Sequence, residues 1–377
     1  MAGWLVAILF VVAILVVVLI HEAGHFLTAK AFGIKVEEFF VGFGPRLWST
    51  RRGETEYGVK ALPFGGYVRI AGMNPFQEPE PGDRPRTFGA KPAWQRAIVI
   101  GTGPVTHFVM AVIFLAVYFS AIGTPEFQPV VSGVEPTLDG RPSPAAEAGL
   151  RQGDVILAVD GSRVASSDDL VALTRARVGR ELAIMVERAG ERIVVRATPV
   201  LSEVGGEQVG RLGIGLADGR LIGRDRIDPL RGIGRGALVT GTITKAVVVR
   251  LGDVFGPAGL RRIGQLLAGS APRTSDDVVS VVGAVRLSAE AGQAGAWDAL
   301  FQLFVLFNVF VGILNLLPLP PLDGGHLAVL AVEKIRRRPV DARRLIPLTA
   351  LVAGFMILFA LSVVYLDIVN PIPNPFR

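Results

Sequence analysis

The chain of 377 residues contains no cysteine. This absence excludes disulfide bonds, thiolate zinc sites and cysteine nucleophiles, so any metal site must be built from histidine and carboxylate side chains. Charge is also scarce, because 19% of the residues are charged and 50% are hydrophobic. Such a composition is typical of an integral membrane protein. No nucleic-acid motif is present, and the net charge of +6 fits a protein that contacts the lipid bilayer, so we expect no nucleic-acid partner.

Four segments are long and apolar enough to cross about 30 Å of hydrocarbon, which requires roughly 20 helical residues. We predict a polytopic α-helical membrane protein with four transmembrane helices, at residues 1–30, 97–123, 298–326 and 345–367. The first segment resembles a signal peptide in length. It has no basic residues before its apolar run and no small-residue cleavage site, so we expect it to remain as a span.

Basic residues crowd the segments between spans one and two (31–96) and between spans three and four (327–344). The positive-inside rule places both segments in the cytosol. Both termini and the long segment 126–297 are therefore predicted to be extracytoplasmic, in a multi-pass protein of the cell (inner or plasma) membrane.

The motif HEAGH occupies residues 21–25, after an apolar run (4–20) without a charged or hydroxyl side chain. On a helix, the two histidines of HExxH lie one turn apart on the same face, where they can bind Zn²⁺, and the glutamate can take a proton from water. At 1.5 Å per residue, His21 lies roughly 25 Å along a helix that begins at residue 4. The site is therefore expected toward the cytosolic side of the bilayer.

A catalytic zinc site usually has three protein ligands and one open position. Outside HEAGH, the candidates for the third ligand are His107, His326 and Asp323. Asp323 lies in NLLPLPPLDGGH, at residues 315–326, near the inner end of the third predicted span. Its three prolines interrupt a helix, and irregular backbone at membrane depth is tolerated where it is buried in protein or lines a watery cavity.

HEAGH in the first span together with NLLPLPPLDGG in a later one resembles the site-2 protease family of intramembrane zinc metalloproteases. The resemblance covers residues 3–370 and is greatest to bacterial members with one PDZ domain. It implies a zinc cofactor with the ligands His21, His25 and Asp323, the general base Glu22, and a role for Asn315 in holding substrate or the oxyanion.

His107 departs from this family pattern, because the family usually has asparagine at that position. It is either a hydrogen-bond donor near the site or a spectator that faces the pore, and we favour the spectator. His326 is either the third nitrogen ligand or a structural group that faces the cytosol, and we favour the latter. Asp323 has an alternative reading as a turn-forming residue before two glycines.

Within segment 31–96, residues 41–45 and 57–68 alternate apolar and small residues between turn signals, which predicts β-hairpins. A sheet edge near the metal can bind an extended substrate as an added strand. The family resemblance implies a membrane-entering β segment here. The alternative is a cytosolic hairpin without a binding role.

In the outer segment, residues 143–161 resemble the helix-turn-strand core of PDZ domains from bacterial proteases. We predict an extracytoplasmic PDZ-like α+β domain at 126–200, which either binds a peptide ligand or acts as a rigid cap. The remainder, residues 201–297, is predicted to be a linker with interfacial helices near 237–249 and 278–291.

The sequence therefore predicts a zinc endopeptidase that cleaves transmembrane segments of single-span membrane proteins. The resemblance implies regulated intramembrane proteolysis, for example of anti-sigma factors or remnant signal peptides. Two alternatives are a catalytically inactive scaffold and a metal-ion transporter. A scaffold has no need of Glu22, and a transporter is expected to distribute its ligands along a path.

Overall fold

The computed structural model describes residues 2–74, 80–204, 207–338 and 340–376. Small parts of the predicted segments, residues 75–79, 205–206 and 339, lie outside the described residues. The chain divides into two compact units. One unit combines Met1–Ala116 with Ile233–Arg377 and is called the helical unit, and the other comprises Val117–Gly232 and is called the β unit.

Four helices within the described residues are long and apolar enough to cross a membrane. They are α1 (Gly3–Ala31), α2 (Ala93–Val117) with the π-helix that follows it (Tyr118–Ile122), α8 (Trp297–Leu316), and α10 (Ile346–Val369) with the preceding turn (Ala342–Leu345). They coincide with the four predicted spans. Large apolar side chains on α1 and α10 are exposed, as expected of surfaces that contact lipid.

The third predicted span, residues 298–326, is shorter in the structure. α8 ends at Leu316, and a separate helix, α9 (Asp323–Arg336), begins six residues beyond Leu317. Prolines at 318, 320 and 321 cause the break, because proline lacks the N–H that a helix needs and clashes with the preceding turn. Asp323 is consequently the first residue of a new helix.

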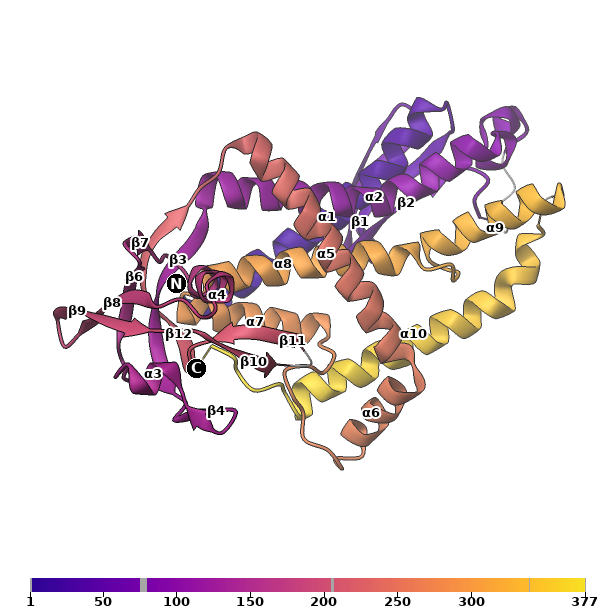
Figure 1. Ribbon diagram of the computed structural model, residues 1–377. Helices are drawn as coiled ribbons and strands as arrows, with labels where there is room; N and C mark the ends of the chain where they lie inside the picture. The colour runs from indigo at the N-terminus through magenta and orange to yellow at the C-terminus, as the bar shows by residue number, and fades with distance from the viewer. Residues whose placement is uncertain (1, 75–79, 205–206, 339, 377) are drawn as a thin grey trace. The chain divides into compact units, whose positions relative to one another are not determined.

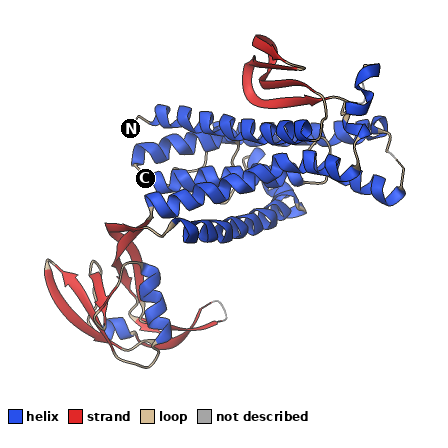
Figure 2. Ribbon diagram, turned by 90° about the horizontal axis from the view of Figure 1, so that it is seen from above, coloured by secondary structure: helices blue, strands red, loops and turns tan. Residues whose placement is uncertain are grey.

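The described part of the helical unit contains three further helices, α5 (Pro229–Phe255, from Ile233 onward), α6 (Pro257–Leu267) and α7 (Val281–Ala294). α7 packs against α1, α8 and α10, and Figure 1 shows it beside α8. Figure 2 shows the long helices of this unit running side by side. Small residues permit this close packing, since a Cβ added at Gly292 would lie 2.5 Å from Val6, and one at Gly283 would lie 2.5 Å from Asp367. The segment predicted as an interfacial helix near 278–291 thus packs one face against the other helices.

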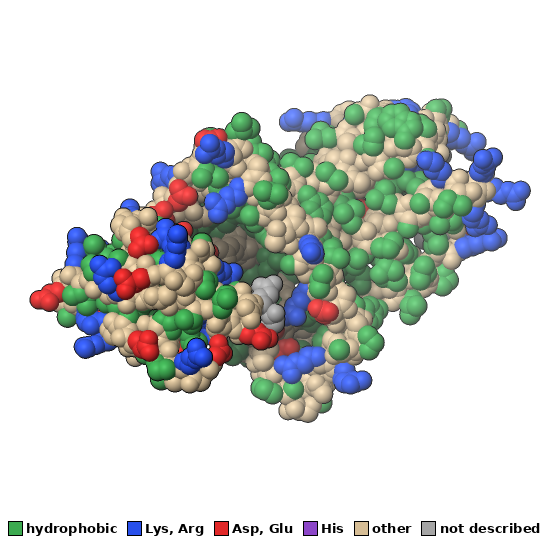
Figure 3. Space-filling model, in the orientation of Figure 1, with side chains coloured by type: hydrophobic (Ala, Val, Ile, Leu, Met, Phe, Trp, Pro, Cys, Tyr) green, Lys and Arg blue, Asp and Glu red, His purple; other side chains and the backbone are tan. Residues whose placement is uncertain are grey.

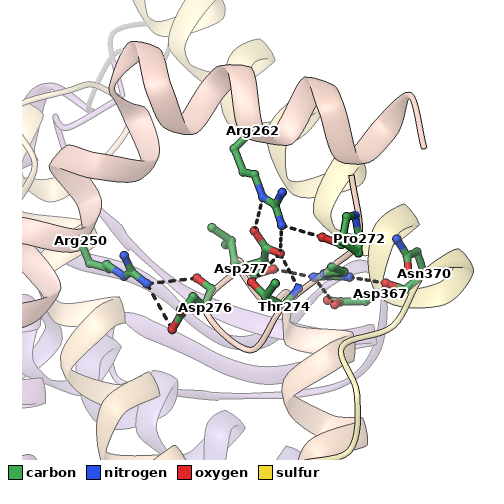
Figure 4. Close-up of polar contacts among 10 residues, drawn as sticks. Arg250, Arg262, Pro272, Thr274, Asp276, Asp277, Asp367 and Asn370 are labelled. Atoms are coloured by element: carbon green, nitrogen blue, oxygen red, sulfur yellow. Dashed lines mark hydrogen bonds and ion pairs between the residues drawn. The ribbon is translucent and has the colours of Figure 1, made fainter. Parts of the chain in front are cut away.

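Ion pairs hold the segment between α6 and α7 (Figure 4). Arg262 of α6 donates two hydrogen bonds of 2.9 Å to the carboxylate of Asp277. That guanidinium keeps the pKa of Asp277 below its usual value. Arg273 pairs with Asp367 of α10 at 2.7 Å, and the side chain of each is 1% exposed. The segment is therefore anchored to the end of α10.

Between α1 and α2, the strands β1 (Val36–Arg52) and β2 (Thr55–Ile70) form a bent antiparallel hairpin. Residues 36–41 pair with residues 66–70 on one side, and residues 38–41 pair with residues 56–59 on the other. Residues 66–70 consequently form an edge of the sheet within the described residues. The predicted β-hairpin is present, and two short 3₁₀ helices (Pro81–Arg86 and Phe88–Ala90) connect it to α2.

The β unit contains a mixed α/β module built on a sheet with the strand order β12-β3-β6-β8-β9, to which β7 adds beside β6. Two helices, α3 (Pro144–Glu147) and α4 (Ser167–Ala176), complete it. Its core is formed by buried aliphatic side chains such as Ile156, Leu182 and Ile184. The strands of the sheet are β3 (Thr124–Val134), β6 (Val155–Val159), β7 (Ser162–Arg163), β8 (Leu182–Arg188), β9 (Glu191–Ala197) and β12 (Ile214–Asp225). The short hairpins are β4 (Thr137–Leu138) with β5 (Arg141–Pro142), and β10 (Val200–Val204) with β11 (Glu207–Arg211).

The β unit extends beyond the predicted boundary at residue 200. β12 lies in the segment that the sequence indicated as a linker, and it pairs with β3 from Ile214 opposite Val134 to Asp225 opposite Thr124. The chain must return to β3 to complete the sheet, so the compact unit continues to Gly232.

Candidate metal centre

Three side chains bring their ligand atoms together in the helical unit. The Nε2 atoms of His21 and His25 lie 3.1 Å apart, and Oδ2 of Asp323 lies 3.2 Å from the first and 3.4 Å from the second. Tetrahedral zinc with bonds of about 2.0–2.2 Å separates its ligand atoms by about 3.3–3.6 Å. The three atoms are therefore spaced to hold one zinc ion, with a fourth position left for water or substrate.

α1 supplies both imidazoles because residues four apart lie on the same face of a helix, one turn from each other. The ring of His25 is held in place by a hydrogen bond of 2.7 Å from its Nδ1–H to the backbone oxygen of Val99 in α2. A carbonyl only accepts, so Nδ1 carries the proton and Nε2 is free to bind a metal.

The tight loop between α8 and α9 positions Asp323. A Cβ added at Gly324 would lie 2.2 Å from the backbone oxygen of Leu316, and one at Gly325 would lie 2.4 Å from the backbone nitrogen of Pro320. Only glycine therefore allows the start of α9 to approach the end of α8 so closely. The carboxylate of Asp323 also lies at a helix N-terminus, where the helix dipole stabilises negative charge.

The backbone of α2 passes directly in front of the imidazoles at Gly103. A Cβ at this position would lie 2.2 Å from Nε2 of His25 and 2.9 Å from Cε1 of His21. On α1, a Cβ at Gly24 would lie 3.0 Å from the side chain of Thr106. The two glycines let α1 and α2 approach each other at the metal centre.

A cavity of about 290 Å³ lies beside the three ligand atoms. Glu22 and Asn315 both line it, and Asn315 comes from the last turn of α8. The carboxylate of Glu22 accepts a hydrogen bond from the backbone N–H of Val68, and a Cβ at Gly66 would lie 3.4 Å from Cγ of Glu22. The structure thus brings every residue of the expected site to one cavity, with the edge of β2 against Glu22.

The same edge carries Tyr67, which also lines the cavity. Its hydroxyl donates a hydrogen bond to Glu38, and burial together with this bond raises the pKa of Tyr67. The Nζ atom of Lys60 lies 4.8 Å from the centre of the Tyr67 ring. These contacts fix the ring in the lining of the cavity as a neutral group.

His107 of α2 and Asn308 of α8 are each 0% exposed and bind each other. Nδ1 of His107 lies 2.7 Å from Oδ1 of Asn308, and Nδ2 of Asn308 donates a hydrogen bond of 2.7 Å to the backbone oxygen of His107. The His107 ring also lies beside His21, with the ring centres 5.1 Å apart. The structure therefore places His107 in the wall of the cavity beside the candidate metal centre, close to a candidate ligand, whereas the sequence favoured a spectator.

His326 lies in α9, three residues beyond Asp323, and is not part of the group of ligand atoms. It lines a second cavity of about 850 Å³, together with Arg96 of α2 and Ala350 of α10. The geometry therefore places Asp323, and not His326, beside the two histidines of HEAGH.

Sequence reasoning did not single out Asn308 or the role of Gly103. The signal for Asn308 was available, because an amide in the middle of an apolar helix is a candidate for interhelical hydrogen bonding. Gly103 gave no comparable signal, since glycine is frequent in membrane helices.

Comparison with known proteins identifies the family of the chain. The family described as "Peptidase family M50" matches residues 9–361 of the chain. The chain is 35% identical to the zinc metalloprotease Rip1 of Mycobacterium tuberculosis and 34% identical to Rip1 of Mycolicibacterium smegmatis, and each match covers 97% of both proteins. A solved PDZ domain of the SdrC-like protein from Listeria monocytogenes matches 24% of this chain and 86% of that one, with 22% identity and a TM-score of 0.20. The matches to M50 and to Rip1 cover nearly the whole chain, so this protein belongs to peptidase family M50, the site-2 protease family, and is a zinc metalloprotease.

Proposed function

We propose that this enzyme cleaves the transmembrane segments of single-span membrane proteins at the centre formed by His21, His25 and Asp323. The observation that carries the proposal is the spacing of their three ligand atoms, 3.1–3.4 Å, beside a cavity within a bundle of membrane-length helices. Such a centre suits hydrolysis, because all ligands converge on one point and leave a fourth position open.

Glu22 and Asn315 have distinct roles in the proposed reaction. When bound, zinc polarises the scissile carbonyl and acidifies water. Glu22 takes a proton from the attacking water and returns it to the leaving amine, and the hydrogen bond from Val68 orients its carboxylate. Asn315 lines the same cavity and donates its amide N–H to the carbonyl oxygen as negative charge develops there.

The substrate binds in extended form along residues 66–70 of β2. A peptide in a helix has its carbonyls occupied by internal hydrogen bonds, so the segment must unwind before it is cut. The edge of the sheet supplies replacement hydrogen bonds by strand addition. It also lies against Glu22, since the backbone N–H of Val68 donates to that carboxylate and a Cβ added at Gly66 would lie 3.4 Å from Cγ of Glu22.

The active site is proposed to face the cytosol, with both termini outside. Lys and Arg side chains gather at the end of the helical unit where α9 ends, while hydrophobic side chains cover much of the surface of the bundle (Figure 3). The last turn of α9 contains Lys334 and Arg336, and the turn before α10 contains Arg343 and Arg344. This asymmetry supports a cytosolic position for that end.

The substrate class we propose is single-span proteins processed by regulated intramembrane proteolysis, such as anti-sigma factors or remnant signal peptides. The β unit is proposed to act as a PDZ-like module that takes an extended peptide. Its edge strand β12 has one strand partner, β3, within the described residues, so it can accept an added strand.

The proposal is tested by reconstituting the enzyme in liposomes with a single-span reporter and locating the cut by mass spectrometry. We expect a cut within the hydrophobic segment by the wild type and none by Glu22→Gln. Cleavage only outside that segment, or equal cleavage by Glu22→Gln, contradicts the proposal.

A further inference from the structure

The two candidate imidazole ligands differ in what holds their second ring nitrogen. His25 donates its Nδ1–H to the backbone oxygen of Val99, at 2.7 Å. Nδ1 of His21 is buried and has no hydrogen-bond partner among the described residues. Histidines that bind a metal almost always donate this second N–H to an acceptor, which fixes the ring and raises its basicity. His21 therefore needs an acceptor.

His107 carries a buried acceptor that is also unused. The backbone oxygen of His107 only accepts, so the group of Asn308 that lies 2.7 Å from it must be the NH₂. This orients the Asn308 amide with Oδ1 toward Nδ1 of His107, at 2.7 Å, and Nδ1 must therefore carry the proton. In the neutral ring, Nε2 is left as a lone-pair acceptor, and it too has no partner among the described residues.

The unused donor and the unused acceptor lie on neighbouring rings. The centres of the His21 and His107 rings are 5.1 Å apart, and both rings line the catalytic cavity. This separation is within reach of a contact between ring nitrogens or of one bridging water. When zinc binds Nε2 of His21, Nδ1 must carry the proton of the neutral ring, so the two nitrogens are complementary.

We propose that His107 is a positioning residue that accepts the Nδ1–H of His21, and that Asn308 holds His107 in the tautomer required to do so. The chain Asn308–His107–His21 then orients one ligand from α8 through α2, as Val99 orients the other. This inference rests on the proposed metal centre, because it assigns His21 as a zinc ligand.

Two substitutions of His107 separate the two ring nitrogens. His107→Asn places an amide near the position of Nδ1, so it can bond to Asn308 but cannot reach His21. His107→Gln places an amide near the position of Nε2 and retains an acceptor for His21. We expect the zinc dissociation constant, measured by chelator competition on purified protein, to rise about 10- to 100-fold in His107→Asn and to be largely restored in His107→Gln.

Asn308→Leu provides an independent variant, because it removes the group that fixes the tautomer without altering His107. It is expected to weaken zinc binding in the wild-type background and to have no further effect in His107→Asn, since the two residues act through one contact. Asn308→Asp keeps the acceptor for Nδ1–H and should retain zinc. The absorption spectrum of the cobalt-substituted protein should change with the zinc affinity, because it reports the ligand field at the metal.

His326→Asn is the matched control, since it makes the same substitution at a histidine outside the group of ligand atoms. Its zinc affinity should equal that of the wild type. Thermal unfolding of the zinc-free proteins identifies a variant that merely loses packing. Lost packing would lower the unfolding temperature even without zinc, and His107→Gln would not restore it.

Wild-type zinc affinity in His107→Asn, equal losses in His107→Asn and His107→Gln, or additive effects of His107→Asn and Asn308→Leu would each overturn the inference. His21→Ala distinguishes this failure from failure of the metal centre itself. If His21→Ala retains zinc, the proposed centre is wrong. If His21→Ala loses zinc while His107→Asn keeps it, only the role of His107 is wrong.

Discussion

Gly103 offers a sharp test of the geometry around the metal centre. Gly103→Ala adds a methyl carbon 2.2 Å from Nε2 of His25, one of the three atoms proposed to hold zinc. Non-bonded atoms of this kind rest about 3.5 Å apart, so the ring or α2 must move by about 1.3 Å. Metal ligands tolerate displacements of about 0.2 Å. The substitution should therefore disturb zinc binding far more than it disturbs the fold.

The expected magnitude follows from the cost of overpacking, which is about 1–3 kcal/mol for an added methyl group in a packed interior. At 1.4 kcal/mol per factor of ten, zinc affinity should fall by about 5- to 150-fold. The assay is chelator competition on purified enzyme, together with the initial rate of reporter cleavage at saturating zinc.

Gly101→Ala is the matched control for Gly103→Ala. Gly101 lies two residues earlier in α2, and a Cβ added there meets no atom within 4 Å. Both variants make the same chemical change in one helix, so Gly101→Ala should retain zinc affinity and activity. A Gly103→Ala enzyme with wild-type zinc affinity and cleavage rate would refute the placement of α2 against the imidazoles.

Three further predictions concern the loop, the ion pairs and the β unit. Gly324→Ala places a methyl carbon 2.2 Å from a backbone oxygen at the end of α8, so it should reduce the zinc content of the purified protein. Metal analysis measures this content, and an unchanged value would contradict the prediction. Arg273→Met leaves the buried Asp367 without its ion-pair partner, with a hydrogen bond from the backbone N–H of Ser280 remaining, and should lower the free energy of unfolding by about 3–5 kcal/mol. Adding Asp367→Leu should recover part of that loss in thermal unfolding. The guanidinium of Arg188 holds the pKa of Asp154 below its usual value. The ionised carboxylate therefore stabilises the fold at pH values above the unfolded pKa of about 3.9, and this stabilisation is lost as the pH falls through the lower folded pKa. Asp154→Asn should therefore destabilise the full chain at pH 7 and lose its effect at strongly acidic pH, and a destabilisation independent of pH would contradict this.

The parts of the fold with a strong local signal were predictable from the sequence. Each long apolar run coincides with a membrane-length helix, and the family and zinc chemistry indicated by HEAGH and NLLPLPPLDGG are confirmed by the matches to M50 and Rip1. The break before Asp323 was also implied, because three prolines in four positions cannot continue a helix. These features depend on residues that are close together in the sequence.

Features decided by distant contacts were not predictable in the same way. β12 joins the sheet through pairing with β3, and its Gly-rich sequence gave no clear strand period, so the β unit was predicted to end too early. The environment of His107 depends on Asn308, which lies 201 residues away along the chain. A single sequence carries no direct record of such pairs.

Zinc content measured beside cleavage rate in one set of purified variants tests the central claim most directly. The account predicts that Glu22→Gln binds one zinc ion per chain but does not cleave the reporter, and that His21→Ala and Asp323→Ala lose the zinc itself. Full cleavage by Glu22→Gln, or wild-type zinc content in both ligand variants, would contradict it.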